Sequence, residues 1–183
     1  MTALSLYSIL LHMKDTRQAT MEQIHFRRAT EADIAVVFAL YRSLVGTPYC
    51  AWTADYPAFE HVVTDVAHGA LYVAQQSTGL IAAGTIDHLE EHDPLQAWAG
   101  QRPCDLLRFG VARNHQGQGI GTGFLRYLCR EAALQKYDAL RILVSSTNFP
   151  AIALYRKIGA IERGDAHAYA IHWLCFEYAL HTV

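Results

Sequence analysis

The amino-acid sequence predicts a single α/β domain of the α+β kind, in which helices cover both faces of a mixed sheet of six to seven strands. Two observations carry this prediction. Apolar residues alternate in some segments, as in strands, and recur every three or four residues in others, as in helices, and the two kinds of segment are interleaved. The chain is also 183 residues long and 52% hydrophobic, which suffices for one well-buried core.

In the first half of the chain, the predicted elements are separated by clear start and stop signals. Residues 24–29 alternate, and Thr30 then stands as the N-cap of a helix, with Asp33 three residues later. Gly46-Thr47-Pro48 ends that helix, and Ser77-Thr78-Gly79 predicts the turn of a hairpin. The predicted elements are a strand at 24–29, a helix through residue 44, a helix at 57–68 that starts at Pro57, and hairpin strands at 71–74 and 80–86.

In the second half, a long polar loop at 88–103 precedes alternating strands and helices. Gly159 ends the last predicted helix, because glycine is the residue that most often stops one. The predicted elements are a strand at 106–111, a helix at 124–133, a strand at 140–144, a helix at 148–158 and a long closing strand at 168–180, with a further short strand at 160–163 left open.

Composition excludes several classes of function. The net charge of −2 gives no reason to expect a nucleic-acid or anionic-membrane partner. The four cysteines form no Cys-x-x-Cys pair, which favours reduced thiols and a cytoplasmic location. An apolar run at 4–13 is too short for a membrane span and lacks the flanks of a signal peptide. We therefore expect residues 1–20 to form an N-terminal extension and residues 21–183 to form one domain.

A glycine-rich junction is the most informative stretch of the chain. Gln116-Gly117-Gln118-Gly119-Ile120-Gly121 lies between a predicted strand and a predicted helix, where free backbone N–H groups and the positive end of the helix can bind phosphate oxygens. The spacing fits neither a Walker loop, which needs Gly-Lys-Ser/Thr, nor the Gly-x-Gly-x-x-Gly of dinucleotide-binding folds. The junction therefore predicts a different diphosphate cofactor, with a simple helix-capping turn as the alternative.

A second motif narrows the choice of diphosphate cofactor. Asn148-x-x-Ala151-x-x-Leu154-Tyr155-x-x-x-Gly159 follows the glycine junction after one predicted helix and one predicted strand. Together the two motifs resemble the GNAT superfamily of N-acetyltransferases, although Ala160 stands where that family usually has Phe. The resemblance implies a GNAT fold and acetyl-CoA (coenzyme A) as the cofactor. It also implies transfer of the acetyl group to a primary amine of a small molecule or peptide.

The resemblance further implies where the cofactor lies. Acetyl-CoA would occupy a V-shaped opening where the strand before the glycine junction splays from the strand after it. Backbone groups of Phe109 and Val111 would bond the pantetheine, Asn148 would contact the same arm, and Lys157 is a weaker candidate for a phosphate. The pyrophosphate would be held by the backbone N–H groups of Gln116, Gly117, Gln118, Gly119, Ile120, Gly121 and Thr122.

The implied chemistry is direct attack of a neutral amine on the thioester in a ternary complex. Tyr155 matches the family's general acid, which protonates the leaving thiolate, and a core tyrosine at helical spacing is the alternative. The usual glutamate base is missing, since Leu107 stands at its position. Asp105 and Glu90 are weaker candidates for the base, and a water relay fits equally well.

Candidate acceptor-binding residues come from the segment between the first two predicted helices. They are Tyr49, Trp52, Asp55 and Tyr56. Aromatic rings beside carboxylates suit a cationic amine, whereas simple packing of these rings on the second helix is the alternative. The sequence specifies neither the amine nor whether the chain acts alone or as a homodimer.

Two other functions stay open. A catalytically idle GNAT fold would sense acyl-CoA without transferring the acyl group. His88-x-x-Glu91-His92 also satisfies a zinc-peptidase pattern, but that chemistry needs both histidines on one face of a helix. Here they leave a predicted strand, and Asp93-Pro94 follows at once. We therefore expect no metal.

Overall fold

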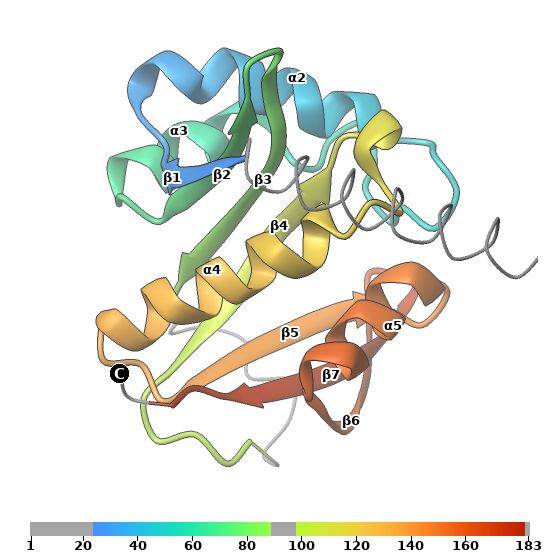
Figure 1. Ribbon diagram of the computed structural model, residues 1–183. Coiled ribbons are helices and arrows are strands. Elements are labelled where there is room, and N and C mark those ends of the chain that lie inside the picture. The colour runs from blue at the N-terminus through green and yellow to red at the C-terminus, as the bar shows by residue number, and fades with distance from the viewer. Residues whose placement is uncertain (1–23, 89–97, 182–183) are drawn as a thin grey trace, which may run out of the picture.

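The computed structural model describes residues 24–88 and 98–181 (Figure 1). The predicted N-terminal extension at 1–20 lies outside these residues, as does much of the predicted loop at 88–103. The elements in chain order are β1 (His25–Arg28), the 3₁₀ turn η1 (Glu31–Asp33), α2 (Ile34–Leu44), α3 (Phe59–Ala67), β2 (Leu71–Gln76), β3 (Gly79–Asp87), β4 (Pro103–Val111), the 3₁₀ turn η2 (Arg113–His115), α4 (Ile120–Leu134), β5 (Ala139–Ser145), α5 (Phe149–Ile158), β6 (Ile161–Ala168) and β7 (Ile171–Ala179).

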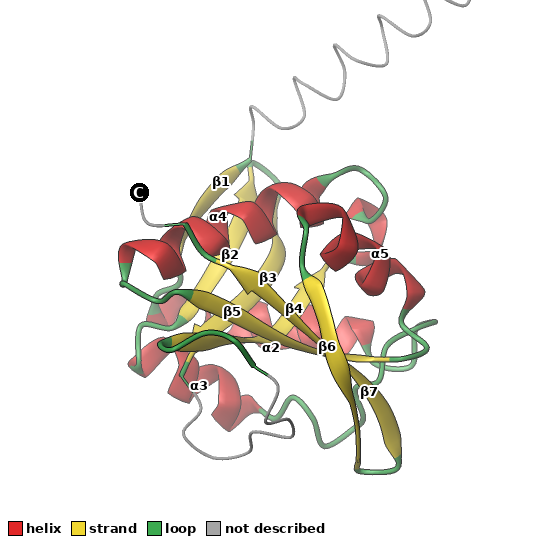
Figure 2. Ribbon diagram, turned by 90° about the horizontal axis from the view of Figure 1, so that it is seen from below, coloured by secondary structure: helices red, strands yellow, loops and turns green. Residues whose placement is uncertain are grey.

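The strands form one seven-stranded mixed sheet in the order β1-β2-β3-β4-β5-β7-β6. The β4–β5 pair is parallel and the other pairs are antiparallel. Helices α2 and α3 cover one face, and α4 and α5 cover the other (Figure 2). The predicted mixed sheet with helices on both faces is thus confirmed. No helix in the described part of the chain is long and apolar enough to cross a membrane.

The two central strands separate part of the way along their length. Parallel pairing joins Pro103–Leu106 of β4 to Ala139–Ile142 of β5 and then stops. From residue 107 to residue 111, β4 is paired only with β3 on its other side. In Figure 1 the two strands diverge toward α5. This divergence produces an opening in the middle of the sheet.

A β-bulge lies in β4 at this opening. Leu107 pairs with Thr85 and Gly110 with Ala83, so two residues of β4, Arg108 and Phe109, face the single residue between them on β3. Arg108 has a positive φ of 49°. The residue of β3 opposite these two is Gly84, and a Cβ on it would lie only 3.1 Å from the Phe109 ring. The missing side chain therefore makes room for Phe109, while Arg108 points to the other face.

The closing segment differs most from the predicted elements. The sequence predicts one long strand at 168–180, whereas the structure has a hairpin of β6 and β7 that turns at Tyr169-Ala170. Both turn residues have positive φ, 54° and 58°, yet neither is the Gly, Asn or Asp that signals such a turn in a sequence. β7 therefore confirms most of the predicted closing strand, whose start was placed too early because Ala168 ends β6 and Tyr169-Ala170 form the turn, and the short strand left open at 160–163 is the start of β6.

Among the other elements, the starts of β4, α4 and α3 are shifted by two residues or more. β4 begins at Pro103, because proline is tolerated as the first residue of a strand. α4 begins at Ile120 rather than at 124, with two glycines in its first turn. α3 begins at Phe59 rather than at Pro57. Its start is fixed by the Ala58 N–H, which donates to Nδ1 of His61 at 2.9 Å.

Candidate active site

The opening between β4 and β5 contains a cavity of about 470 Å³. Six segments line it: the end of α2 with its connection to α3, the second half of β4, the glycine junction with the first turn of α4, the end of β5, helix α5 with its cap, and Trp173 of β7. The glycine junction and α5 carry the two sequence motifs. The cavity therefore brings residues from both motifs to one place.

The glycine junction forms a turn that only glycine adopts easily. Gly117 and Gly119 have φ angles of 73° and 86°, and a side chain at either position would meet no atom within 4 Å. Gly119 is the N-cap of α4. The first hydrogen bond of this helix joins the N–H of Gly123 to the carbonyl of Gly119, so the N–H groups of residues 120–122 have no partner within the helix. The open space beside these donors suits a phosphate group.

The side chains of the junction brace its shape. Nε2 of Gln116 donates to the Val111 carbonyl at 2.9 Å, and Nε2 of Gln118 donates to the Asn114 carbonyl at 2.9 Å. Ile120 is fully buried in the core. Gln116, Gly117, Gly119, Gly121 and Thr122 line the cavity, whereas Gln118 and Ile120 do not.

The second motif places a capping residue and a tyrosine on α5. Oδ1 of Asn148 accepts the Ala151 N–H at 3.2 Å and so caps the helix, which explains the asparagine independently of any ligand. Tyr155 is buried and packs beside Phe176, and it also lines the cavity. Burial raises the pKa of Tyr155 above its ordinary value, and no described residue hydrogen-bonds its hydroxyl. The hydroxyl therefore stays protonated at neutral pH and is free to donate. Lys157 also lines the cavity.

Of the candidate bases, only Asp105 lies in the described part of the chain, and it is not among the residues that line the cavity with Tyr155. Asp105 is half-buried in β4, opposite Asp87 of β3, and does not line the cavity. Glu90, Glu91 and His92 lie outside the described residues. His88 follows the end of β3, where its Nδ1 lies 3.1 Å from the Pro103 carbonyl. The described lining contains no aspartate, glutamate or histidine.

The predicted acceptor residues divide into two pairs. Tyr49 and Trp52 line the cavity, whereas Asp55 and Tyr56 do not. The Tyr49 ring meets the Phe149 ring edge-on, with centroids 5.9 Å apart, and so connects the α2–α3 segment to α5. A Cβ at Gly110 would lie 3.2 Å from the Trp52 ring, which shows how closely this ring packs on β4.

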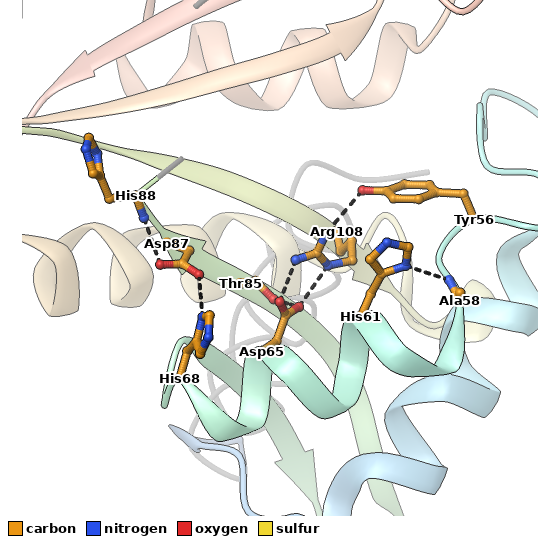
Figure 3. Close-up of polar contacts among 9 residues, drawn as sticks. All are labelled: Tyr56, Ala58, His61, Asp65, His68, Thr85, Asp87, His88 and Arg108. Carbon is orange, nitrogen blue, oxygen red and sulfur yellow. Dashed lines mark hydrogen bonds and ion pairs between the residues drawn. The ribbon is translucent and has the colours of Figure 1, made fainter. Parts of the chain in front are cut away.

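An ion pair at the cavity was missed by the sequence reasoning (Figure 3). Arg108 lines the cavity, and its Nε and Nη2 donate to the two carboxylate oxygens of Asp65 on α3. Thr85 donates to the same carboxylate at 2.6 Å, and Nη1 of Arg108 donates to the Tyr56 hydroxyl at 3.4 Å. Only 10% of the Arg108 side chain and 4% of the Asp65 side chain are exposed.

Two opposing effects act on the Arg108 guanidinium. Burial lowers its pKa, but the hydrogen bonds and the charge of Asp65 outweigh burial and raise the pKa above its ordinary value. Arg108 is therefore charged at any pH that the protein encounters. The sequence held a signal for this pair, because Arg108 interrupts an apolar strand and Asp65 lies on the apolar face of its helix beside Val62.

Away from the cavity, one group of described side chains has the spacing of metal ligands. It comprises Asp165, His167 and His172 near the turn of the β6–β7 hairpin, with ligand atoms within 4.8 Å of one another. Nε2 of His172 lies 3.0 Å from the Asp165 carboxylate, and the two imidazole rings stack at 4.5 Å. Asp165 and His172 are thus already hydrogen-bond partners of each other. The expectation that the protein needs no metal remains a prediction.

Comparisons with known proteins identify the family of this chain. The model of the acetyltransferase (GNAT) family matches residues 37–160. The probable N-acetyltransferase family 8 member 5 of Mus musculus is 28% identical over 148 residues, covering 77% of this chain and 62% of the mouse protein. The chain thus spans less than two thirds of that relative's length.

Solved structures show the same fold. The ribosomal-protein-S18-alanine N-acetyltransferase of Escherichia coli superposes with a TM-score of 0.69 at 15% identity, covering 87% of this chain and 96% of that one. A putative acetyltransferase of Salmonella typhimurium, solved with its cofactor acetyl-CoA, gives a TM-score of 0.69 at 16% identity over 88% of this chain and 96% of that one. The fold is therefore the one that these N-acetyltransferase structures share. The protein belongs to the GNAT acetyltransferase family.

Proposed function

We propose that the protein transfers the acetyl group of acetyl-CoA to a primary amine of a small molecule or peptide, by direct attack within a ternary complex. One observation carries this proposal. A single cavity joins the glycine junction, the unpaired edge of β4 and the buried hydroxyl of Tyr155, in a chain of the GNAT family.

The residues present fit the cofactor. The backbone N–H groups from Gln116 to Thr122 would hold the pyrophosphate, because the space beside Gly117 and Gly119 is open. The edge of β4 at Phe109 and Val111 would bond the pantetheine amides in the manner of a neighbouring strand. Asn148 and Lys157 are the remaining contacts that we propose. When bound, acetyl-CoA supplies the activated acetyl group as a thioester.

The protein's own part in the chemistry is to move protons. A protonated amine has no lone pair, so it must lose its proton before it attacks. Because the described lining holds no carboxylate or imidazole, a chain of waters is our preferred route for this proton, with Asp105 and Glu90 as the alternatives. Tyr155 would then donate its proton to the leaving thiolate.

Two measurements test the proposal. Calorimetry should detect acetyl-CoA binding to the purified protein, and a thiol-reactive dye should detect release of coenzyme A when a panel of amines is added. Binding without release for every amine would favour the alternative function, an acyl-CoA sensor of the same fold. Absence of binding would reject both. The cytoplasmic location and the homodimer remain predictions of the sequence.

A further inference from the structure

The charge of the cavity does not suit a cationic acceptor. Two charged side chains occur among its described lining residues, Arg108 on β4 and Lys157 on α5, and both are cations. Asp65, the carboxylate nearest to Arg108 in the described chain, is buried, and its oxygens already accept bonds from Arg108 and Thr85. The initial expectation of a cationic amine therefore finds no counter-charge in this part of the site.

The guanidinium of Arg108 has donors to spare. It carries five N–H groups. Nε and Nη2 each use one on Asp65, and Nη1 uses one on Tyr56 at the long distance of 3.4 Å. One N–H on each of Nη1 and Nη2 remains without a partner among these contacts, 10% of the side chain is exposed, and Arg108 is among the residues that line the cavity. Asp65 holds the planar group in a fixed orientation, as a planar recognition site requires.

We infer that Arg108 binds a carboxylate of the acceptor, so that the acceptor is an amino acid, or a derivative of one, with a free carboxylate. A guanidinium with two adjacent N–H groups matches the two oxygens of a carboxylate.

The rest of the wall indicates what else the acceptor carries. Trp52, Leu143 and Trp173 line the same cavity and offer apolar surface. An acceptor that places its carboxylate on Arg108 would set its remaining atoms against these side chains. The substrate class is therefore an α-amino acid with an apolar or aromatic side chain. This inference rests on the proposed acetyl transfer, and its test separates the two.

The test compares matched acceptors. L-Phenylalanine, L-leucine and L-tryptophan are each assayed beside their amides and the corresponding amines without the carboxylate, with coenzyme A release as the readout. In the wild type we expect kcat/KM for the acid to exceed that for its partners by about ten- to a hundredfold, the usual worth of a hydrogen bond between charged groups. Arg108→Gln should bring this ratio close to one, mainly through KM. The intrinsic reactivity of each amine is the same in both assays. The change in the acid-to-partner ratio between wild type and Arg108→Gln therefore measures the contribution of Arg108 alone.

Two further variants keep the result interpretable. Arg108→Gln leaves the buried Asp65 carboxylate without a counter-charge, which threatens folding. The double variant Asp65→Asn with Arg108→Gln removes both charges together and should lose the same preference. Arg163→Gln is the matched control, because Arg163 forms a comparable pair with the buried Glu177 at 2.9 Å but does not line the cavity. It should keep the wild-type ratio. Thermal melting and acetyl-CoA affinity verify that each variant folds.

The outcomes discriminate clearly. Acetylation of amines without preference for the acid, or a preference that survives in the folded double variant, overturns the carboxylate subsite and leaves acetyl transfer intact. If no amine reacts although acetyl-CoA binds, acetyl transfer fails. The subsite is then decided by calorimetric titration of the three amino acids into protein saturated with coenzyme A, where binding in the wild type and its loss in the double variant are expected.

Discussion

At the scale of single residues, the Tyr155 hydroxyl is distinguished by its surroundings. It lines the cavity from a buried position, and burial keeps it protonated. Tyr155→Phe removes this proton and keeps the ring packed beside Phe176. We expect kcat to fall about 10²-fold, the low end for general acids, because a thiolate is already a fair leaving group. Affinity for acetyl-CoA should stay level, since the proton matters in the transition state.

Steady-state turnover at saturating acetyl-CoA measures this effect once an accepted amine is known. If wild type and variant turn over equally while chemistry limits the rate, Tyr155 is a packing residue. The raised pKa adds a second expectation, because a donor that deprotonates only at strongly alkaline pH should give no loss of kcat from its own titration between neutral and moderately alkaline pH.

Gly119 offers a second prediction at this scale. Gly119→Glu should place a carboxylate in the space that we assign to the pyrophosphate and weaken acetyl-CoA binding at least tenfold by calorimetry. Gly46→Glu is the matched control, because Gly46 has a similar φ of 75°, also meets no atom within 4 Å, and does not line the cavity. Equal affinity in a folded Gly119→Glu protein would place the diphosphate elsewhere.

At the scale of elements, the sequence predicted those features whose determining residues lie within a few positions of one another. The glycine turn and the Asn148 cap were predictable, because the signal and the structure occupy the same few residues. The hairpin at Tyr169-Ala170 was not, since its turn residues adopt positive φ without the usual residue types. The Arg108–Asp65 pair joins elements 43 residues apart, and no local pattern specifies such a partner.

The connection from β1 to α2 carries a stability prediction. Both oxygens of Asp33 accept bonds from Arg27, at 2.7 and 2.8 Å, and the Thr30 N–H donates to the same carboxylate at 2.8 Å. The Arg27 guanidinium above all lowers the pKa of Asp33 to about 2. Asp33→Asn should lower the free energy of unfolding at neutral pH by about 1–2 kcal/mol.

The pH dependence of the stability that Asp33 contributes follows from the direction of its pKa shift, which is downward. A carboxylate whose pKa is lowered in the folded state stabilises the fold above its unfolded pKa, and this stabilisation is lost as the pH falls toward 2. Urea unfolding at pH 7 and pH 3 should therefore show a difference between wild type and Asp33→Asn that shrinks in acid. Asp55→Asn, at an exposed position, should show no such trend.

The end of β3 bears on the question of a metal. His88 follows this strand and lies on no described helix, while Glu91 and His92 of the His-x-x-Glu-His pattern lie outside the described residues. The proposed chemistry draws on a tyrosine proton and backbone donors. We expect acetyl transfer to be unchanged after prolonged chelator treatment. Loss of activity that zinc restores would revive the hydrolase alternative and redirect attention to the histidines.

At the scale of the whole molecule, the two halves of the sheet are weakly joined at their centre. β4 and β5 share four residue pairs, whereas β5 and β7 share seven. A ligand that bonds the free edge of β4, the glycine turn and α5 would tie the halves together. At one hundred times its dissociation constant, acetyl-CoA should add about 2.7 kcal/mol of stability and raise the Tm by roughly 5–10 °C. Gly119→Glu should remove most of this shift.

The divided sheet would also make the rate at which the protein is degraded depend on the concentration of the proposed ligand, acetyl-CoA. Proteases cut the transiently unfolded form of a protein, so a ligand that binds only the folded form lengthens the protein's half-life by a factor of one plus the ratio of ligand concentration to dissociation constant. If acetyl-CoA binds as proposed, a cell with a depleted supply of it would hold less of this protein as well as less of the acetyl donor. The rate of acetylation would then fall for two reasons, less protein and less acetyl-CoA, and its decline would be steeper than saturation kinetics alone would give.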